Sequence, residues 1–323
     1  MTTIPPDVTI QQLIDSAHSD KQEPPRPHYG CSMAGRKCDR QLWLAHRWSV
    51  VEQFPGRILR LFRRGHNEEH TVVADLEAIG CTITDRQSRV VFSAHVSGSV
   101  DGVVVGVPGA PMSRHLLEIK TASKKQFDKI AKEGVQKAKP EHYVQQQLYM
   151  LGSHSAKTWI GGPPPKLKRS LYVVICKDDD RMHTERVRFD REFAELQRNR
   201  AISISEADEM PPGISQDSSW WECRFCSAHK LCHETHLTQE VNCRTCAHST
   251  ADATGWHCAK WDQYVPTADQ RIGCDWHVLH PDLVPLEMES IDDPMRVKYG
   301  AHVNGEGATS SQELIALLSG EKK

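Results

Sequence analysis

The chain has 323 residues, a formal net charge of −2, 38% hydrophobic and 25% charged residues. This balance is typical of globular proteins and excludes fibrous and largely disordered classes, while the length suits one large domain with a smaller one. No run of about 18 apolar residues occurs and the N-terminus lacks a signal pattern, so we expect a cytoplasmic protein without membrane association. With so little net charge, a nucleic-acid partner would have to be held by local basic clusters.

Periodicity and turn residues predict an α/β domain. A proline-containing arm over 1–30 holds one short helix near 10–16, and helical spacing of apolar residues follows. Period-two and β-branched runs then predict strands, and Pro140 and Asp190 mark helix starts. In chain order we expect helices at 38–48 and 58–80, strands at 81–84, 90–92, 100–107 and 116–120, helices at 123–134 and 140–152, strands at 171–176 and 184–189, and a helix at 190–205.

The most informative residues for chemistry are Asp101, Glu118 and Lys120. Strand alternation places Glu118 and Lys120 on one face, because side chains on a strand repeat every two residues. If the strand of Asp101 is a neighbour, two carboxylates can hold Mg²⁺ and leave coordination positions for water and a phosphate oxygen. Phosphodiester hydrolysis needs an activated water and positive charge at the phosphate, and Lys120 can supply charge there.

Two further groups lie on predicted helices before and after this motif. Residues 64–70, Arg-Gly-His-Asn-Glu-Glu-His, concentrate potential metal ligands on one long helix. Downstream, Gln145 and Tyr149 are four residues apart, so both side chains can reach toward one site. The upstream ligand is left open between His66, Glu68, Glu69 and His70.

In this order the motifs resemble those of the RecB-type branch of the PD-(D/E)XK nuclease superfamily, which includes phage exonucleases and CRISPR-associated adaptation nucleases. The resemblance covers about residues 31–235 and implies a central mixed β-sheet flanked by helices. It is carried by Arg64-Gly65 with Glu69, Gly98 with Asp101, Glu118 with Lys120, and Gln145 with Tyr149. Val100 stands where the family has its name-giving proline.

The resemblance also implies roles for these residues. Asp101 and Glu118 would bind a catalytic Mg²⁺ or Mn²⁺, and Glu69 or His66 would complete its ligand shell. Lys120 would act on the attacking water, while Gln145 and Tyr149 would position the site against DNA.

Eleven cysteines in a cytosolic type of sequence favour metal ligation over disulfides. Cys38, Cys223, Cys226 and Cys232 form a first set that fits a 4Fe-4S cluster or a zinc ion. The iron–sulfur members of the RecB-type nucleases also have one cysteine before the nuclease core and three after it. This resemblance favours the 4Fe-4S cluster over zinc. Cys31 is an alternative fourth ligand.

A second set of cysteines predicts a small zinc-ribbon-like module over 241–285, because paired thiols and two later ones are typical of structural Zn²⁺ sites. Cys243, Cys246, Cys258 and Cys274 are the expected ligands, with His257 and His277 as substitutes. Trp256, Trp261 and Trp276 either pack its core or offer a stacking surface to a nucleobase. We expect a nuclease domain over 31–240, including the first cysteine set, and a polar tail over 286–323.

These features predict a metal-dependent deoxyribonuclease, most simply a DNA exonuclease of recombination, repair or phage DNA processing. The expected partner is DNA. The motifs also allow a protein partner, which could be a recombination or annealing protein, a helicase or further copies of the chain. The competing hypothesis is a non-catalytic nucleic-acid or protein adaptor whose working part is the zinc module. An iron–sulfur redox protein is disfavoured, because no cofactor-binding glycine motif accompanies the cysteines.

Overall fold

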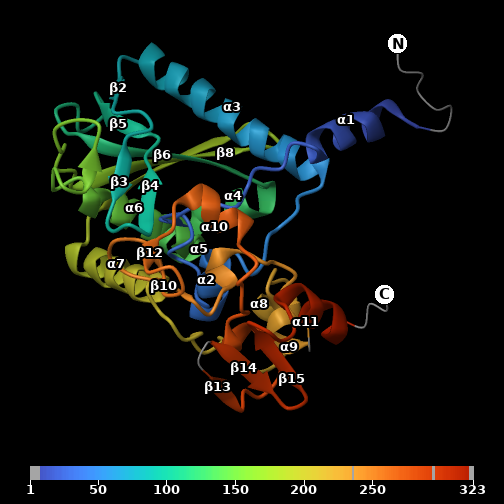
Figure 1. Ribbon diagram of the computed structural model, residues 1–323. Helices are drawn as coiled ribbons and strands as arrows, with labels where there is room; N and C mark the ends of the chain where they lie inside the picture. The colour runs from blue at the N-terminus through green and yellow to red at the C-terminus, as the bar shows by residue number, and fades with distance from the viewer. Residues whose placement is uncertain (1–7, 235, 293–294, 320–323) are drawn as a thin grey trace, which may run out of the picture. The chain divides into compact units, whose positions relative to one another are not determined.

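The computed structural model describes residues 8–234, 236–292 and 295–319. These residues fall into two compact units that interleave along the chain (Figure 1). Unit 1 holds the described residues up to 25, then 52–91 and 98–195. Unit 2 holds 26–51, 92–97 and the described residues from 196 onward. The units therefore do not follow the expected division near residue 240, since 26–51 belong with the C-terminal part.

Unit 1 is built on a five-stranded mixed sheet with the order β2-β5-β6-β8-β9. The central strands β6 and β8 are parallel, with Glu118 beside Tyr172, and the other neighbours are antiparallel. The strands are β2 (Thr82–Thr84), β5 (Gly102–Val105), β6 (His115–Ala122), β8 (Arg169–Cys176) and β9 (Met182–Arg188). In a second sheet, β3 (Arg89–Val91) pairs antiparallel with β7 (Trp159–Ile160).

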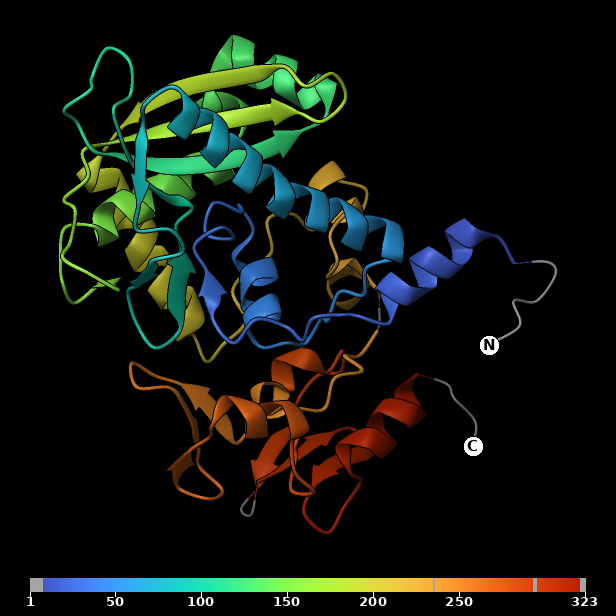
Figure 2. The same cartoon turned by 90° about the horizontal axis from the view of Figure 1, so that it is seen from above.

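Helices cover both faces of this sheet, as Figure 2 shows. The long helix α3 (Gly56–Ala78) packs Val72 and Val73 against Leu117 and Ile119 of β6. The opposite face carries Tyr172 and Val174 and is covered by α4 (Lys124–Glu133), α5 (Val135–Ala138) and α6 (Pro140–Gly152). Odd-numbered residues of β6 thus face α3, and even-numbered ones face the other helices. The predicted α/β class with a mixed sheet flanked by helices is confirmed.

Local signals in the sequence explain where several helices begin and end. Pro140 occupies the first turn of α6, where a missing N–H costs nothing. Asp190 accepts a hydrogen bond from the Phe193 amide and caps α7 (Arg191–Ser205). Gly134, with φ of +78°, ends α4. The expected strand over 100–107 is interrupted: β4 (Val96–Ser99) ends before Asp101 and β5 begins after it.

Unit 2 consists of short elements around loops. Its N-terminal part pairs β1 (Tyr29–Gly30) with β4 and continues into α2 (Asp39–His46). Its remaining elements before residue 285 are α8 (Trp221–Arg224), α9 (His229–His233), η1 (Cys243–Thr245), β10 (Ser249–Ala251), β11 (Trp256–Cys258), β12 (Gln263–Tyr264), α10 (Thr267–Ile272) and η2 (Pro281–Leu283). Strands β10, β11 and β12 form one antiparallel sheet.

The C-terminal segment over 286–323 was expected to be a polar tail, and this is wrong for its described part. It forms a three-stranded antiparallel sheet and a helix, namely β13 (Ser290–Asp292), β14 (Arg296–Tyr299), β15 (His302–Gly305) and α11 (Ser311–Leu318). Val297, Tyr299, Leu314 and Ile315 are buried in a cluster with residues of the cysteine-rich part, including Leu279. These few apolar side chains are spaced too widely to stand out in the sequence.

Arg244, between Cys243 and Cys246, joins distant segments of unit 2. Its buried guanidinium donates to Gln270 Oε1 at 2.8 Å and to the carbonyls of His46 and Pro27, and it stacks on the Trp48 ring at 3.7 Å. Removing such a group leaves several buried acceptors without donors. We expect Arg244→Ala to lower the free energy of unfolding by about 3–5 kcal/mol, measured by urea denaturation, with Arg198→Ala, which is on the partly exposed α7, as control.

No helix within the described ranges is both long and apolar enough to cross a membrane.

Candidate active site

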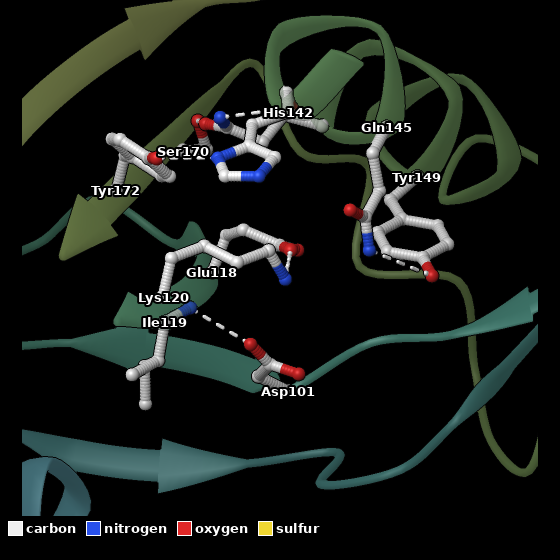
Figure 3. A network of polar contacts seen from close by, with 10 residues as sticks. Asp101, Glu118, Ile119, Lys120, His142, Gln145, Tyr149, Ser170 and Tyr172 are labelled. Carbon is white, nitrogen blue, oxygen red and sulfur yellow. Dashed lines mark hydrogen bonds and ion pairs between the residues drawn. The ribbon is translucent and has the colours of Figure 1, made fainter. Parts of the chain in front are cut away.

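Asp101, Glu118 and Lys120 lie together in unit 1, as Figure 3 shows. Asp101 follows β4 at the strand break, and its Oδ2 accepts a 2.7 Å hydrogen bond from the backbone N–H of Ile119 on the neighbouring strand β6. The Lys120 ammonium forms an ion pair with Oε1 of Glu118. The strand break therefore holds one carboxylate against the backbone of the strand that carries the other.

Glu118 is fully buried, and its environment disfavours charge on its carboxyl group. Burial raises the pKa of Glu118 to about 7, although Lys120 acts in the opposite direction and Asp101 adds to the rise. Apart from the ion pair, neither carboxylate oxygen has a hydrogen-bond partner among the described residues. A buried carboxylate with so few partners needs further positive charge, and a divalent cation can supply it.

Glu69 is the upstream candidate that lies closest to these groups electrostatically. Burial raises its pKa, and the charge of Asp101 raises it further, while His66, Lys120 and His70 lower it. Glu69 also contributes to the raised pKa of Glu118. His70 instead approaches the Arg86 guanidinium at 3.4 Å. Among the four alternatives, Glu69 is therefore the one whose charge is coupled to those of Asp101 and Glu118, and His66 on the same helix lowers its pKa.

Gln145 and Tyr149 lie on one side of α6, and the Gln145 amide donates to the Tyr149 hydroxyl at 3.3 Å. Both side chains are buried. Figure 3 places their polar ends on the side of the site where the Glu118 carboxylate lies. The pair is thus brought to the same region as Asp101, Glu118 and Lys120, and its role toward DNA stays a prediction.

Two residues of this region were not singled out from the sequence. His142 Nδ1 lies 2.6 Å from the Tyr172 hydroxyl, between the motif strands and α6 (Figure 3). Burial, together with the charges of Lys120 and Lys139, lowers the pKa of His142 to about 3, so the ring is neutral near pH 7. The signal in the sequence is weak, since His142 precedes Gln145 by three residues and Tyr172 is one tyrosine in an apolar strand.

The side chains fit a hard divalent cation bound together with a substrate phosphate. Within the described ranges no three or more His, Cys, Asp or Glu side chains are arranged to enclose a metal ion. Catalytic Mg²⁺ commonly uses one or two carboxylates and takes its other ligands from water and phosphate, so a closed protein cage is not required. The donors available here are Asp101, Glu118 and Glu69.

The residues of the first cysteine set all belong to unit 2 and influence one another electrostatically, although among the described residues no three such side chains are placed to hold a metal ion. Burial raises the pKa of the thiols of Cys223, Cys226 and Cys232, and a charge on Cys38 raises each further. Next to these cysteines, the Lys37 ammonium lies 2.6 Å from the Glu222 carboxylate. All four thiols are free of disulfides, as is the alternative ligand Cys31, whose side chain is fully buried. Mutually repelling thiolates are a donor set that a metal centre would stabilise.

The second cysteine set lines a cavity of about 170 Å³ in unit 2. Burial raises the pKa of Cys243 to about 11 and of Cys246 to about 12, and charge on Cys274 raises both further. Cys258 belongs to the same wall. His277 is engaged elsewhere, because its ring nitrogens contact Ser311 Oγ at 2.8 Å and the Asn242 carbonyl at 3.0 Å. His257 lies 3.3 Å from an Asp262 oxygen.

The three tryptophans of this module divide between the two expected uses. Trp256 is 2% exposed and packs against His46 and His95. Trp261 and Trp276 are 50% and 38% exposed, with the Lys260 ammonium 4.2 Å from the Trp276 ring. Trp256 is therefore a packing residue, and the other two leave ring surface accessible.

No protein-family model and no curated protein match this sequence. Among solved structures, the chain is similar to SSO0001, with a TM-score of 0.40 and 12% identity over 70% of this chain and 96% of that one. It is also similar to the alkaline exonuclease LHK-Exo from Laribacter hongkongensis, with a TM-score of 0.34 and 16% identity over 60% and 90%. The complex of LHK-Exo with dAMP gives 0.35 and 15% over the same shares. These similarities are distant, and the activity of this chain has to be inferred from its own residues.

Proposed function

We propose that this chain is a metal-dependent deoxyribonuclease that hydrolyses phosphodiester bonds, acting as a DNA exonuclease in recombination, repair or phage DNA processing. The observation that supports it most directly is the convergence of Glu69, Asp101, Glu118 and Lys120, in which a fully buried carboxylate has a single ion-pair partner. Three carboxylates and one ammonium at one end of a sheet are the groups that metal-assisted phosphodiester hydrolysis requires.

Each residue has a distinct role in this proposal. Asp101 and Glu118 would hold Mg²⁺ or Mn²⁺, with Glu69 or His66 completing the shell. A divalent ion held by these residues would supply Lewis-acid chemistry, lowering the pKa of a water molecule and neutralising charge on a phosphate oxygen. Lys120 donates from the edge of the same site, where it orients the attacking water and stabilises negative charge on the phosphate. Gln145 and Tyr149 would form one wall of the site and orient the DNA strand.

The test uses protein purified without oxygen and end-labelled DNA. Linear duplex, linear single strand and covalently closed circles are incubated with Mg²⁺, Mn²⁺ or EDTA. We expect loss of the linear substrates only with metal, and the position of the released label gives the direction of digestion. Intact DNA in every metal, with DNA still bound, would refute the nuclease and leave the adaptor hypothesis.

The raised pKa of Glu118 predicts how metal affinity depends on pH. A proton on this carboxyl, whose pKa is about 7, competes with the cation, so the metal-binding form is lost as the pH falls through that value. Below pH 7 we expect the Mg²⁺ concentration for half-maximal activity to rise by up to about tenfold per pH unit, and above it to level off. Activity titrations with Mg²⁺ from pH 5.5 to 8.5 measure this, and a flat profile would contradict it.

The cysteines support two further metal centres in this proposal. Cys38, Cys223, Cys226 and Cys232 would hold a 4Fe-4S cluster, with zinc as the alternative, and Cys243, Cys246, Cys258 and Cys274 would hold a structural Zn²⁺. Both would act by fixing the short elements of unit 2, whose apolar residues are too few for a large core.

The adaptor hypothesis is kept for one reason, the accessible rings of Trp261 and Trp276 beside Lys260. Aromatic rings next to a cation suit the stacking of unpaired bases. If this surface were the functional site of an adaptor, the Trp261→Ala variant would lose DNA binding. The Asp101→Asn variant would bind DNA unchanged, and neither the variants nor the unaltered protein would cleave DNA.

A further inference from the structure

A second feature of unit 1 adjoins the candidate active site. A pocket of about 330 Å³ lies between the even-numbered face of the sheet and the starts of α4 and α6. Lys120 is part of its wall, so the pocket is continuous with the catalytic residues. Lys139 and Lys177 bring two more ammonium groups, and Thr121 and Ser123 bring hydroxyl groups.

The charged side chains that line this pocket are all positive. The lining contains three lysines, and the described residues that line it include no carboxylate. The Lys120 ammonium is neutralised in part by Glu118, whereas Lys139 and Lys177 take part in no ion pair within the described chain. Ammonium groups that line one pocket attract an anion into it.

The positions of the lysines are set by the fold rather than by chance on a surface. Lys139 is the residue before Pro140 at the start of α6, and its charge reaches His142. Lys177 directly follows β8, and its carbonyl accepts a 2.8 Å hydrogen bond from the Arg64 guanidinium on α3. Both lysines are half-buried.

The remaining lining favours a phosphate over a metal or an apolar ligand. Ser123 is the N-cap of α4 but makes no capping hydrogen bond, so its hydroxyl is available as a donor. At the start of α4, the backbone N–H of Lys124 already donates to Asp178 Oδ2 at 2.6 Å. The Tyr172 hydroxyl contacts the neutral His142 ring at the inner wall, and the charges of Glu118, Glu185 and Glu141 act on Tyr172 from outside the lining. Ammonium and hydroxyl groups are donors that phosphates bind, and both kinds line this pocket.

We propose that this pocket binds a backbone phosphate of the nucleic-acid strand next to the one that is cleaved, with Lys139 and Lys177 as its ligands. This inference rests on the proposed nuclease function, because the pocket shares Lys120 with that site. A phosphate held here would fix the register of the strand, so the scissile phosphate would reach Asp101 and Glu118 with little remaining freedom.

The test measures binding of a fluorescent single-stranded oligonucleotide in EDTA, where no cleavage occurs. The variant is Lys139→Gln with Lys177→Gln, and the matched control is Lys129→Gln with Lys132→Gln, two exposed lysines of α4 outside the pocket. We expect the pocket variant to bind about ten- to a hundredfold more weakly, and its log–log salt slope to fall by about 0.7. The arginine pair at positions 139 and 177 should restore most of the affinity.

A second arm identifies the phosphate. Oligonucleotides carry one neutral methylphosphonate at successive positions, and we expect one position to weaken binding to the unaltered protein but not to the pocket variant. Equal binding by the pocket and control variants overturns the proposal. Weaker binding without any position-specific coupling also overturns it, since the lysines then act only as general charge.

Failure of this proposal is distinguishable from failure of the proposed function. The binding arms need neither metal nor cleavage, so they decide the pocket even if no DNA is cut. Conversely, cleavage of linear DNA at equal rates by the pocket and control variants would keep the nuclease and exclude the pocket.

Discussion

Replacing Asp101 by Asn is expected to lower the rate of DNA cleavage about a hundred- to ten-thousand-fold. An amide removes the charge that would hold the cation but keeps an oxygen that can accept from the Ile119 N–H, now found at 2.7 Å from Oδ2. The loss should therefore be one of chemistry rather than of folding. Single-turnover cleavage of end-labelled linear duplex with saturating protein measures it.

Lys120 is expected to behave differently, because its removal leaves the fully buried Glu118 without its ion-pair partner. Lys120→Ala should abolish cleavage and also destabilise unit 1 by about 3–5 kcal/mol. The double variant Glu118→Gln with Lys120→Met removes both charges and should regain much of the stability without any activity. Lys125→Ala, an exposed lysine of α4, is the matched control and should cut normally. Normal cleavage by Asp101→Asn or by the double variant would exclude this active site.

The parts of unit 1 that the sequence predicts well depend on local signals. Alternation in β6 separates Leu117 and Ile119 from Glu118 and Lys120, and the structure has them on opposite faces. Pro140 and Asp190 mark the helix starts where they occur. Such features are encoded within a few residues, so periodicity and capping preferences suffice to find them.

The remainder depends on contacts between residues that are distant in sequence. Residues 26–51 join the C-terminal unit although they precede Asp101, Glu118 and Lys120 in the chain, and no local pattern carries that information. The strand break at Asp101 lies just before β5 begins. The first residue of β5, Gly102, pairs with Leu117 of β6. His142 became a site residue only through its contact with Tyr172, thirty residues away. Topology has to be known before these residues can be recognised.

The metal content of unit 2 is the second property for which we expect a large effect. Cys246→Ser should remove one equivalent of zinc per chain and unfold the cysteine-rich module, since structural Zn²⁺ contributes on the order of 10 kcal/mol to small folds. Cys226→Ser should instead remove iron and the visible absorption of a 4Fe-4S cluster, or a second zinc if that set holds zinc. Elemental analysis of protein purified without oxygen measures both.

The control for both variants is Cys81→Ala, a buried thiol of unit 1 that packs in the apolar core with Val104 and Leu117. It should keep the full metal content and lose only the modest stability of a small buried side chain.

Removing the metal with a chelator should have the same effect as Cys246→Ser. The thermal midpoint of unit 2 should then fall below that of unit 1. The affinity for zinc should also fall as the pH is lowered, because burial and neighbouring thiols keep the pKa of Cys246 near 12 and protons compete with the metal. Protein that holds no metal in either set, yet melts like the Cys81→Ala variant, would mean that these thiols are ordinary core residues and that unit 2 folds without a metal.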